Sequence, residues 1–140
     1  LGYNTLYGDT VGAIAPIGDL YKDEVISLCK YINRNFQDII PEEIINRVPT
    51  AELREDQKDE DDLPPYSITN RLLYEMIENN RTDKELIKLG FDKEIISRVH
   101  AAIKRSEFKR RQMPPIIKLK QKSFGMGRRV PITSYFRYMR

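Results

Sequence analysis

The chain has 140 residues, of which 40% are hydrophobic and 32% charged, with a formal net charge of +3 at pH 7. This length suits one ordinary domain with a modest core, and no apolar run approaches the roughly 20 residues that span a bilayer. The lone cysteine, Cys29, excludes a disulfide framework and a cysteine-based metal site. Its place in a helical apolar pattern predicts a buried small hydrophobic residue, and we expect a soluble chain in a reducing cytoplasm.

The N-terminal third predicts a loop followed by two helices. Residues 1–18 are rich in Gly and Tyr and lack periodicity, so we expect loop and short extended pieces. A helix within 19–37 is predicted from apolar residues at helical spacing, namely Val25, Leu28, Cys29, Ile32 and Phe36. Pro41 stands at a plausible first position of a short helix in 41–48, which Pro49 ends.

Two further helices are predicted beyond an acidic stretch. The first lies within 66–80, with Ser67 as a possible cap. Its expected inner face consists of Ile68, Leu72, Met76 and Ile77. The second lies within 82–90 and opens with a capping box of Thr82 and Glu85, and the glycine that follows terminates it.

Asp92 can cap the last predicted helix. The apolar stripe of this helix is Ile95, Val99, Ala102 and Ile103. We expect the helix to run into the basic segment 104–112 and to stop before Pro114, and the tail beyond it to be extended and irregular. The chain is therefore predicted to be mainly α-helical.

Opposite charges are concentrated in two blocks. Residues 55–62 are acidic, interrupted only by Gln57 and Lys58, whereas 104–140 is basic with Glu107 as its only carboxylate. Such an asymmetry favours a polyanionic partner for the basic block, although solvated surface is the alternative for any single charge.

Two stretches of the N-terminal half could bind phosphate. "LYGDTVGAIAPIGDLYK" (6–22) is a glycine-bearing loop entering a helix, where backbone N–H groups can hold an anion and Lys22 adds a charge. An ordinary surface lysine is the alternative. "VPTAELREDQKDEDDLPPY" (48–66) offers the Thr50 hydroxyl to a phosphate oxygen, and its carboxylates could hold Mg²⁺ or pair with cations. A solvated acidic linker is the alternative here.

Two stretches of the C-terminal third are basic. "EFKRRQMPP" (107–115) would bind phosphate or nucleic acid, but its cations also suit an exposed helix end. "GRRVPITSYFR" (127–137) has interleaved aromatics that suit base stacking or a docking tail. His100, with no second histidine, is expected to be structural or on the surface. No nucleophile–base pair, zinc pattern or complete phosphate loop is present, so the residues alone point to phosphate binding.

Taken in this order, "TLYGD…APIGDLYK", "RVPTAELREDQKDEDDLPPY", "EFKRRQMPP" and "RRVPITSYFR" resemble the C-terminal part of the synthetase domain of NAD⁺ synthetase. The likeness is closest to the long bacterial, glutamine-dependent type and covers essentially all of 1–140. It implies that the chain is a mainly α portion of an α/β adenine-nucleotide α-hydrolase (ATP-pyrophosphatase) domain.

The resemblance implies a ligase of NAD biosynthesis. ATP, with Mg²⁺, would adenylate the nicotinate carboxylate of deamido-NAD⁺ and release pyrophosphate. Ammonia would then attack the acyl-adenylate to give NAD⁺ and AMP, and a separate glutaminase domain with a Glu-Lys-Cys triad would supply that ammonia. The resemblance also implies a homo-oligomer, dimer or larger, that has neither nucleic acid nor membrane as a partner.

Individual residues follow from the same resemblance. Lys22 and Thr50 match the ATP-binding lysine and threonine, and Lys109 matches the basic residue that binds deamido-NAD⁺. Asp9 is expected either to be structural or to position a neighbouring binding residue, and 49–65 to be a mobile loop that closes over both substrates. No catalytic residue and no metal ligand is assigned within the chain.

Departures from the family pattern bear on the subtype. Phe108, Leu6 and Ala13 replace a His, a Lys and an Asp of the short, ammonia-dependent enzymes, which favours the long type. The SGGxDS loop that cradles ATP, the upstream metal-binding Glu and the glutaminase domain are absent. We therefore expect these 140 residues to be part of a larger enzyme and, alone, not to make NAD⁺. The alternative functions are a basic helical nucleic-acid-binding module and an oligomerisation module.

Overall fold

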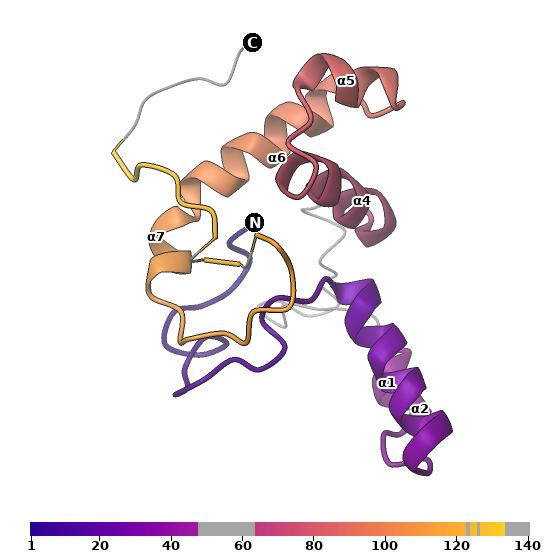
Figure 1. Cartoon of the computed structure of the whole chain (residues 1–140). Helices are drawn as coiled ribbons and strands as arrows, with labels where there is room; N and C mark the ends of the chain where they lie inside the picture. The colour runs from indigo at the N-terminus through magenta and orange to yellow at the C-terminus, as the bar shows by residue number, and fades with distance from the viewer. Residues whose placement is uncertain (48–63, 123, 126, 134–140) are drawn as a thin grey trace, which may run out of the picture. The chain divides into compact units, whose positions relative to one another are not determined.

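The computed structural model of the chain describes residues 1–47, 64–122, 124–125 and 127–133 (Figure 1). The chain divides into two compact units. One comprises Leu1–Asp19 and Arg71–Arg140, and the other comprises Leu20–Asn70. The predicted mobile loop 49–65 lies outside the described residues except for its last two positions.

The Leu20–Asn70 unit contains α1, which covers Lys22–Phe36, and α2, which covers Glu42–Ile45. α1 begins where Glu24 Oε2 accepts the Tyr21 N–H at 2.7 Å, which satisfies one of the orphan donors of a helix start. Two hydrogen bonds close the connection from α1 to α2: Asn33 Nδ2 donates to Ile40 O at 2.7 Å and Ile40 N donates to Asn33 Oδ1 at 3.0 Å. The two predicted helices are confirmed.

α1 lies within the predicted range 19–37, but the predicted burial of its residues was wrong. α1 begins at Lys22, because Asp19 is buried and its carboxylate binds backbone N–H groups of the C-terminal segment instead. No residue of α1 is buried, and Phe36 is 62% exposed. Cys29, predicted to be buried, is only partly covered.

Helix α4, covering Tyr66–Ile77, begins one residue before its predicted cap. Ser67 therefore lies inside the helix, and the carbonyl of Pro65 accepts the Ile68 and Thr69 N–H groups at 3.0 and 2.9 Å. A proline fixes φ near the helical value, so the proline pair sets this start without a serine cap. Ile68, predicted to face inward, is 40% exposed, so that prediction was also wrong.

The local signals of the next two helices are confirmed. α5 covers Asp83–Lys88, and Thr82 N donates to Glu85 Oε2 at 2.8 Å while Glu85 N donates to Thr82 Oγ1 at 3.4 Å. Gly90 has φ +90°, the left-handed conformation that commonly ends a helix. α6 covers Lys93–Arg105, and the Asp92 carboxylate accepts the Glu94 and Ile95 N–H groups at 2.7 and 3.1 Å.

These helices share one apolar core within the larger unit. It is formed by Leu72, Met76, Leu86, Phe91, Ile96, Val99 and Ile103. Val99 and Ile103 of the stripe predicted for α6 are buried as expected, but at its first position Ile96 is 2% exposed, whereas Ile95 only borders the core. Burial of these side chains supplies the main stabilising term.

The segments outside the helices also meet within this unit. Ala15 and Ile116 form an isolated parallel bridge, in which Ala15 N donates to Pro115 O at 2.8 Å. Among the described residues there is no named strand, so the prediction of a mainly α chain is confirmed for that part. None of the described helices combines the length and apolar character required to cross a bilayer.

Candidate functional site

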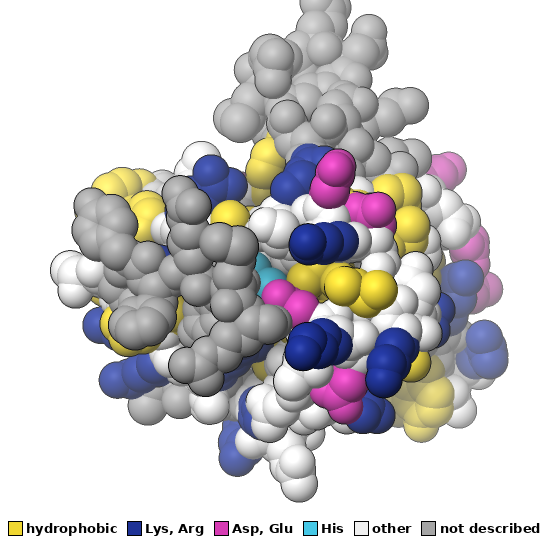
Figure 2. All heavy atoms as spheres, turned by 90° about the horizontal axis from the view of Figure 1, so that it is seen from above, with side chains coloured by type: hydrophobic (Ala, Val, Ile, Leu, Met, Phe, Trp, Pro, Cys, Tyr) yellow, Lys and Arg dark blue, Asp and Glu magenta, His cyan; other side chains and the backbone are white. Residues whose placement is uncertain are grey.

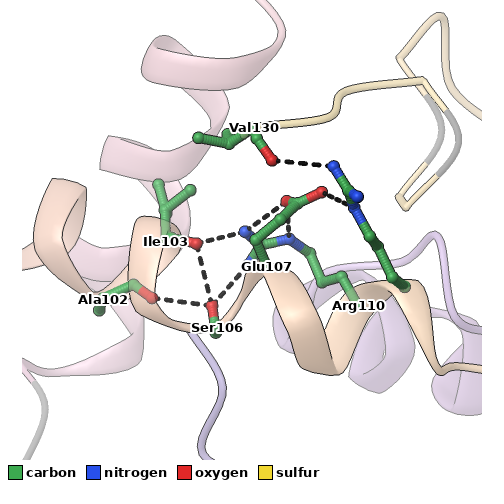
Figure 3. A network of polar contacts seen from close by, with 7 residues as sticks. Ala102, Ile103, Ser106, Glu107, Arg110 and Val130 are labelled. Carbon is green, nitrogen blue, oxygen red and sulfur yellow. Dashed lines mark hydrogen bonds and ion pairs between the residues drawn. The ribbon is translucent and has the colours of Figure 1, made fainter. Parts of the chain in front are cut away.

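The predicted basic helix end is a separate short helix. α7 covers Glu107–Arg111 and follows α6 after a break at Ser106. The Ser106 hydroxyl donates to the Ala102 carbonyl at 2.8 Å, and Arg110 Nη2 donates to the Ile103 carbonyl (Figure 3). The Ala102 carbonyl still accepts the Ser106 N–H at 3.0 Å, so the break follows from the Arg110 side chain, which binds the Ile103 carbonyl, the next acceptor of the helical ladder.

Glu107 is the centre of the polar network at this break (Figure 3). Its side chain is 2% exposed and pairs with Arg110 Nη2 at 3.0 Å and Arg111 Nε at 3.1 Å. Burial raises the pKa of this carboxyl, but hydrogen bonds from the two guanidinium groups and the Val130 backbone outweigh burial and lower the pKa overall. Arg111 also donates to Val130 O at 3.2 Å, which holds the C-terminal segment on α7.

Lys109 is used differently from its neighbours on α7. Its ammonium donates to the carbonyls of Gly2 and Asn4 at 2.7 and 2.5 Å, more than a hundred residues away in sequence. Of the three cations of this helix, two therefore bind Glu107 and the third binds the N-terminal segment. The basic cluster predicted from 107–115 is largely engaged within the protein.

A closed turn follows directly after the N-terminal residues that Lys109 contacts. The Asp9 carboxylate accepts the Thr5 N–H at 2.8 Å and the Thr5 hydroxyl at 3.1 Å, and Thr5 Oγ1 accepts the Asp9 N–H at 3.2 Å. The Thr5 backbone and hydroxyl bonds, followed by a smaller effect of Lys109, hold the pKa of Asp9 below its usual value. The structural role predicted for Asp9 is confirmed.

Asp19 anchors the tail of the larger unit. It is 6% exposed and accepts backbone N–H groups of Leu119 and Lys120, both at 2.8 Å, and of Phe124 at 2.7 Å. Burial raises the pKa of this carboxyl, but the three donors outweigh burial and lower the pKa. No local sequence pattern predicts this role of Asp19, because its partners lie 100 to 105 positions away.

Lys22 is the first residue of α1 and is exposed. Asp23 and Glu24 stand beside it in the first turn, where their charge already complements the positive end of the helix dipole. Glu24 takes the Tyr21 N–H, and Asp23 Oδ1 accepts Asn70 Nδ2 at 2.8 Å. At this helix start, the Lys22 ammonium is therefore the group best suited to bind an anion.

The three predicted binding residues are not assembled within one unit. Lys22 belongs to the Leu20–Asn70 unit, Lys109 belongs to the other, and Thr50 lies outside the described residues. In the described part of the chain, no group of three or more His, Cys, Asp or Glu residues could hold a metal ion. His100 pairs with Asp83 at 2.9 Å, which confirms the structural role expected for it.

The buried ion pairs of Glu107 were not among the sequence-based predictions. A signal for them was present, since Glu107 is the only carboxylate in the basic block and stands three and four positions before Arg110 and Arg111. Residues at these spacings are neighbours on a helix surface and pair readily. The spacing could have predicted the ion pairs but not their burial.

By its architecture the chain is a mainly helical piece that carries cationic residues suited to an anionic ligand. A family model described as NAD synthase matches residues 1–114. The glutamine-dependent NAD(+) synthetase of Synechocystis sp. is 40% identical over 97% of this chain and 24% of its own length. The enzyme of that name from Acinetobacter baylyi is 44% identical over 98% of this chain and 26% of its own length.

A solved structure of glutamine-dependent NAD+ synthetase from Acinetobacter baumannii in complex with ADP is also similar, with 36% identity and a TM-score of 0.48. The similarity covers 94% of this chain and 22% of that one. The chain belongs to the NAD synthase family. It spans about a quarter of the length of the curated relatives it matches.

Proposed function

We propose that this chain is part of a glutamine-dependent NAD⁺ synthetase. The enzyme would amidate deamido-NAD⁺ to NAD⁺ through an acyl-adenylate and release AMP and pyrophosphate. The observation that carries the proposal is 40% identity over 97% of the chain to a protein named for this activity. Because the chain spans only about a quarter of such relatives, we propose that the activity requires a longer protein and that these 140 residues alone do not make NAD⁺.

The proposed roles of the chain's own residues are electrostatic. Lys22 would hold ATP phosphates as a point charge beside the start of α1, and Thr50 would donate its hydroxyl to a phosphate oxygen. Both would stabilise charge that develops on the α-phosphate and the leaving pyrophosphate during adenylation. Lys109 would contact the anionic deamido-NAD⁺, and the Glu107 network supports this role by fixing the helix that carries the lysine.

The remaining parts of the proposal concern the parent enzyme. Mg²⁺ would accompany ATP and neutralise its phosphates, while residues 49–65 would close over the substrates. A glutaminase domain would supply ammonia, and the chain would belong to an α/β ATP-pyrophosphatase domain of a cytoplasmic homo-oligomer, dimer or larger. The name of the relatives as glutamine-dependent supports the ammonia source.

Substitutions in the intact protein test these roles. We expect Lys22→Met, Thr50→Ala and Lys109→Met each to lower kcat/KM for NAD⁺ formation by about 100-fold, as when one preorganised donor is lost. Because the residues would act on adenylation and substrate binding, the loss must be equal with glutamine and with ammonia as nitrogen source. The exposed Lys118→Met serves as the charge-matched control and keeps full activity.

Comparing the two nitrogen sources distinguishes a defect in ammonia supply from a defect in adenylation or substrate binding. A loss confined to glutamine would assign the residues to ammonia supply and contradict the proposed roles. Absence of ATP-dependent NAD⁺ formation by the intact protein from either source would refute the proposed function itself.

A further inference from the structure

Lys109 has a structural role besides its charge, because its ammonium is hydrogen-bonded to the N-terminal segment. An ammonium has three N–H donors, and Lys109 uses two of them on the carbonyls of Gly2 and Asn4 at 2.7 and 2.5 Å. Within the described part of the chain, the third donor has no acceptor. The lysine therefore holds residues 1–4 against α7 while one N–H remains for a ligand.

A steric contact fixes the same segment independently of the lysine. Gly2 has φ +81°, and a Cβ at this position would overlap the Cβ of Ser106 at the break between α6 and α7. Only glycine allows the backbone to approach this closely. The Gly2 carbonyl is thereby placed within reach of Lys109, just before the loop that the Thr5–Asp9 hydrogen bonds close.

The α7 end of the contact is also rigid. Glu107 is buried between two arginines, and Arg110 binds both Glu107 and Ser106 Oγ, the latter at 2.5 Å. Lys109 is therefore held from both sides, by α7 and by the N-terminal segment.

We propose that Lys109 is a bridging residue that couples the order of residues 1–10 to the binding of the anionic dinucleotide. This inference rests on the proposed function for the identity of the ligand, but the contact with residues 1–4 does not. Linkage requires the coupling to be reciprocal: an ordered segment strengthens binding by the same factor by which the bound ligand strengthens the segment. Loosening the segment must then weaken binding even when Lys109 is intact.

The first experiment measures hydrogen exchange of the amides of residues 3–10 in the intact protein without ligand. Lys109→Met is expected to speed exchange about 10-fold or more, since it removes two charge-assisted hydrogen bonds. Lys118→Met, an exposed lysine of the same unit, leaves exchange unchanged. Equal exchange in wild type and Lys109→Met would overturn the inference whatever the ligand is.

The second experiment measures the Kd for deamido-NAD⁺ in a variant that keeps Lys109. Gly2→Ala, which displaces the segment from Ser106, is expected to raise the Kd about 10-fold, and saturating ligand is expected to slow exchange of residues 3–10 in the wild type. Gly90→Ala is the matched control, because Gly90 also has positive φ, at +90°, but nothing lies within 4 Å of its added Cβ. Its Kd stays at the wild-type value.

The outcomes separate the coupling from the proposed function. A lower Kd in Gly2→Ala would mean that the Gly2 and Asn4 carbonyls compete with the ligand for Lys109. An unchanged Kd would mean that they do not affect binding. Either result would overturn the coupling. A wild-type protein that does not bind deamido-NAD⁺ would overturn both the proposed function and the coupling to this dinucleotide. In that case faster exchange in Lys109→Met would still establish the contact with the N-terminal segment.

Discussion

The Asp19 carboxylate accepts three backbone hydrogen bonds, and no local sequence signal predicts them. Its Oδ2 accepts the N–H groups of Leu119 and Lys120, and its Oδ1 accepts that of Phe124, all within 2.8 Å. Hydrogen bonds to a charged acceptor are worth more than neutral ones. A single carboxylate thus fixes the course of the segment that follows the Ala15–Ile116 bridge.

We predict that Asp19→Asn lowers the free energy of unfolding by about 2–3 kcal/mol at pH 7, the contribution expected of hydrogen bonds to a charged group. The amide replaces one acceptor oxygen with an NH₂ group that faces backbone donors. Urea denaturation measures the change, and Asp38→Asn, an exposed aspartate, is the control. Equal losses in both variants would contradict the anchoring role.

The pH dependence of this difference has a defined sign. The folded pKa of Asp19 is lowered, so its stabilisation is complete above the unfolded pKa, about 3.9, and is lost as the pH falls through the folded pKa. The gap between wild type and Asp19→Asn should therefore be constant near neutrality and shrink from about pH 4 downward. A gap that widens in acid would exclude the ionised carboxylate as its cause.

At the scale of helices, one of two similar cap predictions was right and the other was wrong. Thr82 exchanges hydrogen bonds with Glu85 at the start of α5, as its spacing predicted. Ser67 offered the same kind of side chain before α4 but lies inside that helix, because the carbonyl of Pro65 takes the free N–H groups.

We therefore predict opposite outcomes for two similar substitutions. Thr82→Ala should cost about 1 kcal/mol of stability, the usual loss for an N-cap. Ser67→Ala should cost nothing or slightly stabilise, since alanine has the higher propensity in a helix interior. Thermal unfolding of the two variants beside wild type checks the pair, and a loss of similar size for Ser67→Ala would mean that the serine does cap α4.

The same contrast explains which features of the fold could be predicted from the sequence. Helix periodicity, the capping box and the Asp92 cap depend on residues within four positions, so they were predictable. The break at Ser106 was not, since it requires Arg110 to reach back to the Ile103 carbonyl. The partners of Lys109 and Asp19 lie about a hundred positions away and follow from no local pattern.

The candidate site divides in the same way. A resemblance over the whole chain identified Lys22, Thr50 and Lys109 as candidate binding residues. The match to the NAD synthase family model confirms the family. Which donors remain available to a ligand is decided by tertiary contacts, such as the two carbonyls on Lys109. Sequence could name the cation but not the bonds it already makes.

For the whole molecule, the distribution of charge decides between phosphate-ligand chemistry and a nucleic-acid-binding module. In the described part of the basic block, several cations are engaged within the protein: Arg110 and Arg111 pair with Glu107, and Lys122 donates to the carbonyls at the end of α4 at 2.6 and 3.2 Å. On the face in Figure 2, Lys and Arg side chains alternate with Asp, Glu and hydrophobic ones. Such a surface releases few counterions when it meets a polyanion.

We accordingly predict that the chain binds single- or double-stranded nucleic acid only weakly at physiological salt, with Kd no tighter than about 10⁻⁴–10⁻⁶ M, the range of non-specific contacts. Filter binding at 50 and 200 mM salt checks this, because each phosphate contact adds about 0.9 to the slope of log K against log salt. Glu107→Gln provides the internal comparison: it releases two arginines from their carboxylate and should steepen the slope. Tight wild-type binding with a steep slope, unchanged by Glu107→Gln, would place the cations on an open nucleic-acid surface and favour the alternative function.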